Sequence, residues 1–240
     1  MQNTEYRNGV INPVECVKQG FELIKSDYWL LFAVTLVGML IGGFTMDILM
    51  GAMMCGIMYA FLNKIDGRPV TFDDLWKGMS WFLPGLLVVL LIVVPVFVFY
   101  IGVYVSMVAA IVVGAQTENG GAMTLAFGVV GLLDVVFLIA MICFHTLLMF
   151  AFPLIVDRNL GAMAAIKTSA KAVWANLGGV AGLMGVNFVL VIIGYMALCV
   201  GVYFVVPIMI AGNVVAYRRV FPSLQSPYQN RPGSFPPNAY

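Results

Sequence analysis

Residues 82–113 read FLPGLLVVLLIVVPVFVFYIGVYVSMVAAIVV and contain no charged side chain. A second apolar run extends from Ala122 to Val156, and Asp134 is its only charged residue. About 18 consecutive apolar residues already indicate a helix that crosses a membrane, whereas buried strands and core helices are shorter. These two runs predict an all-α integral membrane protein.

The composition of the whole chain indicates the same class. Of its 240 residues, 62% are hydrophobic and 10% are charged, and the mean hydropathy is +1.00. Soluble domains contain roughly 25% charged residues, so a soluble protein is excluded. A net charge of +1 provides no general attraction to nucleic acid. The four cysteines lie far apart, mostly in apolar segments, so we expect neither a disulfide framework nor a metal site.

Six apolar segments are candidate membrane spans, arranged as three hairpins. They are Tyr28–Thr45, Asp47–Asn63, Phe82–Val113, Ala122–Val156, Leu177–Cys199 and Val200–Tyr217. The first hairpin has about 16 residues per arm, or about 24 Å of helix against about 30 Å of hydrocarbon, so it either spans the membrane or is re-entrant. The second hairpin is too long for one crossing, and we expect it to tilt, to kink at Pro95 or to project outward.

The basic residues predict the orientation of the chain. All twelve lie in the N-terminal segment, the second connection, the fourth connection or the C-terminus, namely Arg7, Lys18, Lys25, Lys64, Arg68, Lys77, Arg158, Lys167, Lys171, Arg218, Arg219 and Arg231. The other connections contain no Lys or Arg, and basic connections are retained in the cytoplasm. We therefore predict a multi-pass protein of a cytoplasmic membrane, with both termini in the cytoplasm.

A short amphipathic segment precedes each hairpin. The first begins with Asn12 as a helix cap and Pro13 at the first helical position. The second begins with Thr71 and Asp74 at capping-box spacing, and the third carries its apolar stripe over residues 163–177. We expect all three to lie on the cytoplasmic surface of the membrane. They either anchor the hairpins and set their depth, or they bind anionic lipid or shape the membrane.

The first and third amphipathic segments superpose at one constant offset. The aligned pairs are Lys18 with Lys167, Gly20 with Ser169, Ile24 with Val173 and Asp27 with Asn176. The match indicates an internal repeat, although the shared composition of interfacial helices can produce it by convergence. We divide the chain into an N-terminal segment (1–27), a membrane domain (28–221) and a Pro-rich tail (222–240) that we expect to be disordered.

One run of residues resembles a known family. It is Phe152-Pro153-Leu154-Ile155-Val156-Asp157-Arg158, followed by Ala165, Ile166, Lys167, Ser169, Trp174 and Asn176. With Gly56–Asn63, Gly67 and Phe72-Asp73-Asp74-Leu75, it looks like the bacterial family related to the membrane domain of glycerophosphoryl diester phosphodiesterases and its stand-alone relatives. The resemblance covers roughly residues 12–221 and implies a polytopic helical protein of the bacterial inner membrane. It implies no enzymatic activity, because the phosphodiesterase reaction belongs to a separate soluble domain.

Three polar residues are candidates for an intramembrane site. Counting back from Asp157 along one helix places His145 about 18 Å deep, near the middle of the membrane. Ionisable groups at that depth are functional candidates by default. Asn187 lies at a similar depth and is the expected partner of His145, between the fourth and fifth spans. Asp134 precedes His145 by almost three helical turns and so lies on the same helix face.

Two of the candidates also have a purely structural interpretation. His145 can be a neutral imidazole packed between helices, and Asp134 can be a solvated carboxylate at the far interface. Small residues form seams that are typical of close helix packing, within one chain or in a homo-oligomer. The seam residues are Gly38, Gly42, Ala52, Gly56, Ala60, Gly178, Gly182 and Gly185.

Catalytic motifs are not recognisable in the sequence. It contains no Ser-His-Asp arrangement, no nucleotide-binding glycine loop and no paired carboxylates at one depth, so we expect neither an enzyme nor a cofactor. The favoured function is a non-enzymatic membrane protein that organises the bilayer or partner proteins. The alternative is a small transporter or channel subunit that uses His145 and Asn187. A weaker hypothesis, which follows from the resemblance, is an accessory subunit of a lipid-active enzyme. The expected partners are the lipid bilayer, a second copy or another membrane protein, and not nucleic acid.

Overall fold

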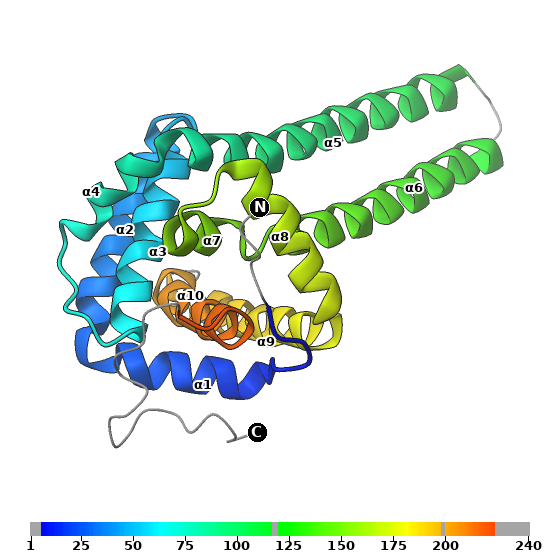
Figure 1. The fold of residues 1–240 in the computed structure, drawn as a ribbon. Helices are drawn as coiled ribbons and strands as arrows, with labels where there is room; N and C mark the ends of the chain where they lie inside the picture. The colour runs from blue at the N-terminus through cyan, green and yellow to red at the C-terminus, as the bar shows by residue number, and fades with distance from the viewer. Residues whose placement is uncertain (1–5, 117–119, 198–199, 224–240) are drawn as a thin grey trace.

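The computed structural model describes residues 6–116, 120–197 and 200–223, and in these ranges the regular secondary structure is entirely helical (Figure 1). The helices are α1 (Pro13–Ile24), α2 (Tyr28–Phe44), α3 (Met50–Ile65), α4 (Asp74–Lys77), α5 (Phe82–Gln116), α6 (Gly120–Leu147), α7 (Ala151–Arg158), α8 (Ala162–Ala175), α9 (Leu177–Met196) and α10 (Gly201–Val220). The 3-10 helices η1 (Lys25–Asp27) and η2 (Gly78–Trp81) lead into α2 and α5. The Pro-rich tail from residue 224 onward lies outside the described residues.

Length and composition allow several of these helices to cross a membrane. Among the described residues, five helical stretches are long and apolar enough, namely Pro13–Phe44, Asp74–Val112, Phe127–Arg158, Leu177–Met196 and Gly201–Val220. Helix α3 is apolar but shorter. The all-α membrane class predicted from the sequence is confirmed, and the short helix belongs to the hairpin whose arms the sequence predicts to be short.

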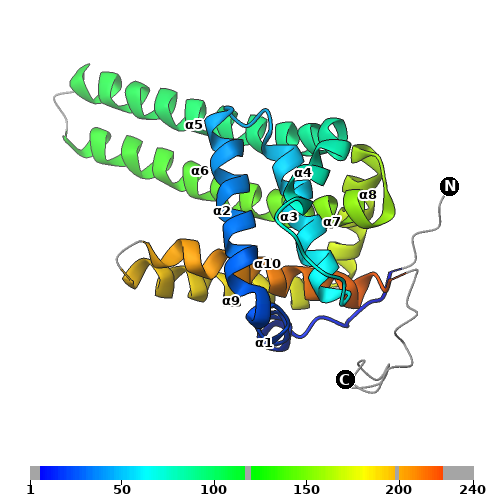
Figure 2. The same cartoon turned by 90° about the vertical axis from the view of Figure 1, so that its left-hand side faces the viewer.

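Two apolar hairpins project from the body of the protein. Figures 1 and 2 show α5 and α6 as one long arm, and Figure 2 shows α9 with α10 as a second. Along the first arm, large apolar side chains are exposed on both helices, including Phe97, Tyr104 and Leu132. So much exposed apolar surface requires a nonpolar environment or an apolar partner. Pro95 lies inside α5, and the long second hairpin projects outward.

The predicted fourth span is not one continuous helix. Helix α6 ends at Leu147, a turn covers residues 148–150, and α7 begins at Ala151. The Ser169 hydroxyl of α8 donates to the Leu147 carbonyl oxygen at 2.7 Å and accepts from the Phe150 N–H at 3.1 Å. This hydroxyl satisfies backbone groups that the helix break would leave unpaired in the interior. The continuous helix predicted over 122–156 is therefore wrong, and the count along one helix that placed His145 about 18 Å deep does not apply.

The first hairpin runs across α10. Near the start of α10, the Tyr28 hydroxyl donates to the Phe204 carbonyl oxygen, and the rings of Phe32 and Phe204 stack with centroids 4.9 Å apart. Near the end of α10, Arg218 pairs with Asp66, which follows α3. About 21 Å of helix separates Phe204 from Arg218, so the base of the hairpin extends along α10. Figure 2 shows α2 and α3 running across the direction of α9 and α10, an arrangement that differs from three parallel hairpins.

The first amphipathic helix begins as its sequence predicts, whereas the second begins at Asp74, three residues after the predicted cap Thr71. The Asn12 side-chain oxygen accepts from the Glu15 N–H at 3.4 Å, and Pro13 is the first residue of α1. The Asp74 carboxylate accepts from the Thr71 N–H at 3.0 Å, which is the reciprocal half of a capping box. Helix α4 continues for a single turn before η2 takes over. Local capping therefore determines where α1 starts, whereas α4 has Asp73 as its N-cap and no side-chain cap.

Helix α1 packs into the protein on its small-residue face. A Cβ atom at Gly20 would lie 2.6 Å from the backbone nitrogen of Gly212 in α10, so the two backbones are in direct contact. A Cβ atom at Gly182 of α9 would lie 2.6 Å from the ring of Pro13. The larger apolar side chains Val14 and Phe21 stay exposed. One face of α1 thus contacts α9 and α10 and another remains available to lipid.

The helix boundaries support the internal repeat. At the offset that aligns Gly20 with Ser169, the cap residues Asn12 and Gly161 coincide, and so do the first residues of the following long helices, Tyr28 and Leu177. The aligned pairs Cys16 and Ala165, Gly20 and Ser169, and Ile24 and Val173 are all buried. Coincident helix ends and coincident buried positions favour a repeated unit over convergence.

The other small-residue seams have mixed roles. A Cβ atom at Gly56 would lie 2.0 Å from the Leu75 carbonyl oxygen, so α3 and α4 approach each other at van der Waals distance. Gly178 and Gly185 of α9 face open space instead. Close packing within the chain therefore accounts for part of the predicted seams.

We predict that Gly20→Ala weakens the contact between α1 and α10. The new methyl group would overlap the backbone at Gly212, and such overpacking costs about 1–3 kcal/mol. Thermal unfolding of the detergent-purified protein measures this loss. Gly185→Ala is the matched control, because it has free space and Ala favours a helix over Gly by about 0.5–1 kcal/mol. Equal melting temperatures for Gly20→Ala and the wild type would contradict the close approach.

Candidate functional site

The carboxyl-terminal ends of three helices meet in one charged cluster. Asp66 follows α3, Asp157 lies near the end of α7, and Arg218 lies in the last turn of α10. An Arg218 guanidinium nitrogen is 2.7 Å from a carboxylate oxygen of Asp66 and 2.7 Å from one of Asp157. The Tyr217 hydroxyl donates to the other oxygen of Asp157 at 2.6 Å. We call Asp66, Asp157, Tyr217 and Arg218 the Arg218 cluster.

The Arg218 cluster is mostly buried. The Arg218 side chain is 11% exposed and that of Asp157 is 14% exposed. Buried charges are costly unless they are paired and hydrogen-bonded. Arg218 donates to both oxygens of Asp66, at 2.9 and 2.7 Å, in the bidentate geometry that makes such pairs strong. A carboxylate is unfavourable at the carboxyl end of a helix, and the guanidinium offsets that effect for two helices at once.

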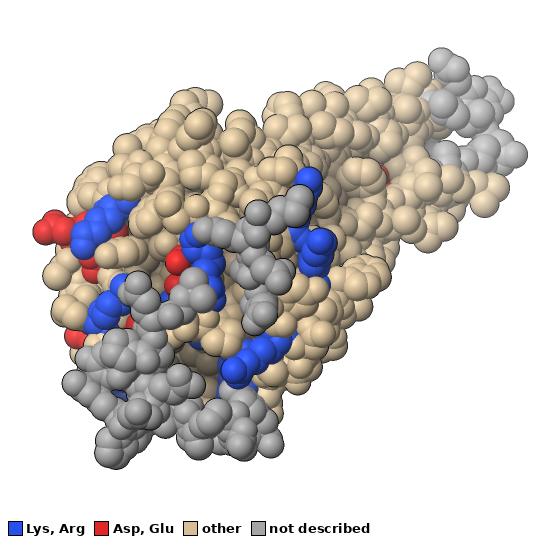
Figure 3. All heavy atoms as spheres, in the orientation of Figure 1, with Lys and Arg blue, Asp and Glu red and all other residues tan. Residues whose placement is uncertain are grey.

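Further ion pairs lie at the same end of the helical body. Lys64, in the last turn of α3, pairs with Asp27 just before α2. Arg158 donates to Asp157 at 3.0 Å and to the Pro222 carbonyl oxygen. Figure 3 shows Lys and Arg side chains distributed over this face of the body, whereas the long arm is almost wholly uncharged. Residues from connections far apart in the sequence therefore share one charged end.

Sequence reasoning did not select the Arg218 cluster as a site. Asp66, Asp157 and Arg218 lie in different parts of the chain, and their contact requires the tertiary arrangement. One sequence signal could have found them, since each is a charge at the carboxyl end of an apolar helix. A cation is favourable in that position, whereas a carboxylate there needs a cation close by.

His145 and Asn187 do not form the expected pair. His145 is half-buried in the last turn of α6, and its Nε2 lies 3.2 Å from the Ile92 carbonyl oxygen of α5. The Asn187 amide of α9 donates instead to the Asn213 side-chain oxygen of α10 at 3.0 Å. The prediction of a His145–Asn187 contact is wrong, because α6 packs on α5 whereas α9 packs on α10.

The remaining polar candidates are also separate. Asn187 is 5% exposed, and its side-chain oxygen has no hydrogen-bond partner among the described residues. Asp134 is half-buried on α6, about 16 Å along the helix from His145. The structure thus brings no two of His145, Asn187 and Asp134 into contact.

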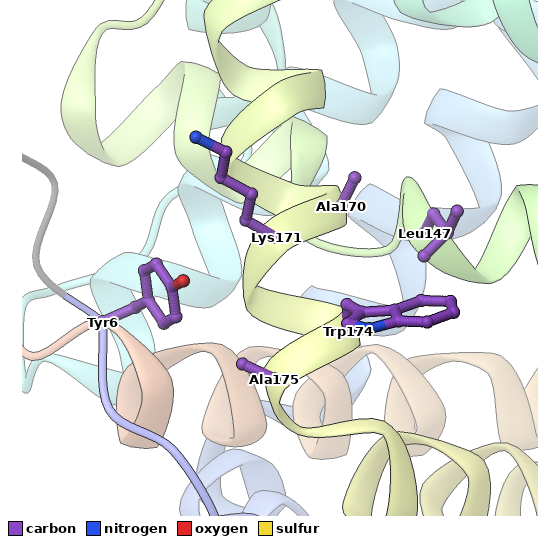
Figure 4. Close-up of a pocket in the computed structure, with 6 residues that line it drawn as sticks. All are labelled: Tyr6, Leu147, Ala170, Lys171, Trp174 and Ala175. Carbon is purple, nitrogen blue, oxygen red and sulfur yellow. The ribbon is translucent and has the colours of Figure 1, made fainter.

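A shallow hollow of about 420 Å³ lies over α8. Its lining residues are Tyr6, Leu147, Ala170, Lys171, Trp174 and Ala175 (Figure 4). They come from the segment before α1, the end of α6 and one face of α8. In the ranges that the structure describes, no three His, Cys, Asp or Glu side chains group closely enough to hold a metal ion.

No family model, no curated protein sequence and no solved structure matches this chain. The resemblance to the membrane domain of glycerophosphoryl diester phosphodiesterases therefore remains a prediction from the quoted motifs.

We predict that Arg218→Met destabilises the protein by about 3 kcal/mol, because it leaves two largely buried carboxylates without their shared partner. Arg68→Gln removes a second cation that pairs with Asp66, but the Arg68 side chain is 51% exposed, so we expect a loss of about 0–1 kcal/mol. Thermal unfolding in detergent compares the two variants. Similar losses of stability in the two variants would show that the buried Arg218 contacts stabilise the protein no more than the exposed Arg68 pair does.

Proposed function

We propose that this chain is a non-enzymatic integral membrane protein that organises the lipid bilayer, or the membrane proteins around it, in a bacterial inner membrane. The proposal rests on the separation of the molecular surface into apolar arms and a charged end. The α5–α6 arm and the α9–α10 hairpin expose large apolar side chains, and the charged end of the body lies away from their tips (Figures 2 and 3). Such a surface suits insertion into lipid with the charged end at one water interface.

We place the charged end on the cytoplasmic side. The basic side chains Lys64, Arg158 and Arg218 all belong to ion pairs at this end. Retention of basic connections in the cytoplasm then assigns both termini to the cytoplasm. The amphipathic helices α1 and α8, which carry further lysines, would lie at the same interface.

The first hairpin would lie along the membrane, close to the cytoplasmic interface. Two observations support this placement: its base contacts α10 from Phe204 to Arg218, and α2 and α3 have only 17 and 16 residues. Helices of this length reach about 24–26 Å, less than the hydrocarbon thickness of about 30 Å. Inserted into one leaflet, the hairpin would expand that leaflet and so bend the bilayer.

A transport function has weaker support. A transporter needs several polar side chains that converge at one level of the membrane. Here His145 contacts the α5 backbone and Asn187 contacts Asn213, on two different hairpins. Each contact resembles an interhelical hydrogen bond that stabilises packing.

Cysteine labelling in a background without native cysteines tests the placement. We expect a cysteine at Thr117, between α5 and α6, to react with a membrane-impermeant maleimide in intact cells. A cysteine at Arg68 should react only after permeabilisation. A cysteine at Met46, at the tip of the first hairpin, should stay unlabelled from outside, because the hairpin does not cross the membrane.

The labelling results test the placement of the first hairpin separately from the orientation of the whole protein. Labelling of Met46→Cys in intact cells would mean that the first hairpin spans the membrane. Labelling of Arg68→Cys but not Thr117→Cys in intact cells would reverse the whole orientation.

Reconstitution tests the function itself. We expect vesicles to narrow as the ratio of protein to lipid rises, while proton flux stays at the level of protein-free vesicles. His145→Asn should leave vesicle shape and stability unchanged, and His145→Leu should lose about 0.6 kcal/mol, the mean value of an interhelical hydrogen bond. A pH-dependent flux that His145→Asn abolishes would replace the proposed function with transport, since Asn cannot titrate near neutral pH.

A further inference from the structure

The hollow over α8 has a polar edge and an apolar edge. Figure 4 shows the Lys171 amine and the Tyr6 hydroxyl on one side, and Trp174 beside Leu147 on the other. Ala170 lies on the side of Leu147 and Ala175 on the side of Tyr6, and their small side chains leave room in the hollow. Trp174 is 72% exposed, so its indole ring forms an open wall of the hollow. The hollow can therefore accept a molecule that is polar at one end and apolar at the other.

The cation at this hollow has no protein partner. Among the described residues, Lys171 belongs to none of the ion pairs, which use Lys64, Arg68, Lys77, Arg158 and Arg218. Neither α8 nor segment 6–11, which precedes α1, contains an Asp or Glu. Lys167 lies one helical turn before Lys171 and is also exposed and unpaired within the described part of the chain. Two lysines at this spacing repel each other, and a bound anion would relieve the repulsion.

Hydrogen bonds with Asn176 hold the segment that carries Tyr6 in place. The Asn176 side-chain oxygen accepts from the Gly9 N–H at 2.7 Å, and its amide donates to the Arg7 carbonyl oxygen at 3.0 Å. The Arg7 N–H donates to the Val220 carbonyl oxygen at 2.9 Å. The segment that carries Tyr6 is therefore fixed against the end of α8 before any ligand binds. Preorganisation of this kind lowers the entropic cost of binding.

We infer that the hollow binds the headgroup of an anionic phospholipid. The phosphate lies at Lys171 and the Tyr6 hydroxyl, and the glycerol and first acyl carbons lie against Trp174 and Leu147. This inference rests on the proposed function only in that α8 lies at the membrane interface. Tryptophan is enriched at that level of the membrane, and an ammonium group near the surface attracts anionic lipid.

Quenching of Trp174 by brominated lipid tests the site. A variant with Trp29, Trp76 and Trp81 replaced by Phe keeps Trp174 as the only tryptophan. It is reconstituted in phosphatidylcholine vesicles that contain a small fraction of either brominated phosphatidylglycerol or brominated phosphatidylcholine. We expect an enrichment of phosphatidylglycerol at Trp174 of about fivefold over random mixing, as one basic residue near the surface provides.

Two variants with the same change of charge locate the effect. Lys171→Gln should reduce the enrichment to that of random mixing. Lys18→Gln, which removes an exposed lysine of α1 without a described partner, should leave it unchanged. Equal loss in both variants would mean that diffuse attraction to the charged end, and not this hollow, selects the lipid.

Other outcomes are equally decisive. Equal quenching by the two brominated lipids would overturn the lipid site but leave the proposed function intact, because Trp174 would still lie in the membrane. No quenching by either lipid would instead contradict the membrane placement of α8. Loss of the enrichment on addition of inorganic phosphate at constant ionic strength would show that the hollow takes free phosphate and would overturn the lipid assignment. If the three tryptophan replacements prevent folding, the quenching difference between the wild type and Trp174→Phe gives the same comparison.

Discussion

Arg218 extends its guanidinium between the carboxylates of Asp66 and Asp157, and this contact joins the ends of α3, α7 and α10. In a chain that is 10% charged, few groups can provide directional contacts between helices. Apolar helices in lipid gain little from burying apolar surface against one another, so polar contacts and close packing determine their arrangement. Arg218 therefore holds the ends of α3, α7 and α10 together at the charged end of the body.

Small side chains determine the packing of helices at positions that the ion pairs do not contact. Gly20 allows α1 to lie directly on the backbone of α10. Ser169, its counterpart in the repeat, satisfies the backbone at Leu147 and Phe150 and so permits the break between α6 and α7. The two repeated units thus use equivalent positions for different purposes. One brings two helices together, and the other ends one helix and starts the next.

These contacts leave two kinds of surface, and the proposed function uses both. The arms expose apolar side chains such as Phe97 and Leu132 over much of their length, as lipid contact requires. Around α8, basic and aromatic side chains frame a hollow with no acidic residue in its lining. A protein that organises a bilayer needs an apolar surface for the acyl chains and a basic surface for the headgroups.

Properties that depend on short stretches of chain could be predicted from the sequence. Hydrophobic runs defined the membrane class, the local cap at Asn12 defined the start of α1, and the offset between aligned segments indicated the repeat. Contacts between distant segments could not be predicted in this way. The partners of His145 and Asn187, the turn over 148–150, and the passage of the first hairpin across α10 depend on which helices pack together. Uniformly apolar helices carry no periodic signal that selects one neighbour over another, so only a few polar atoms and glycine contacts in the folded chain make that choice.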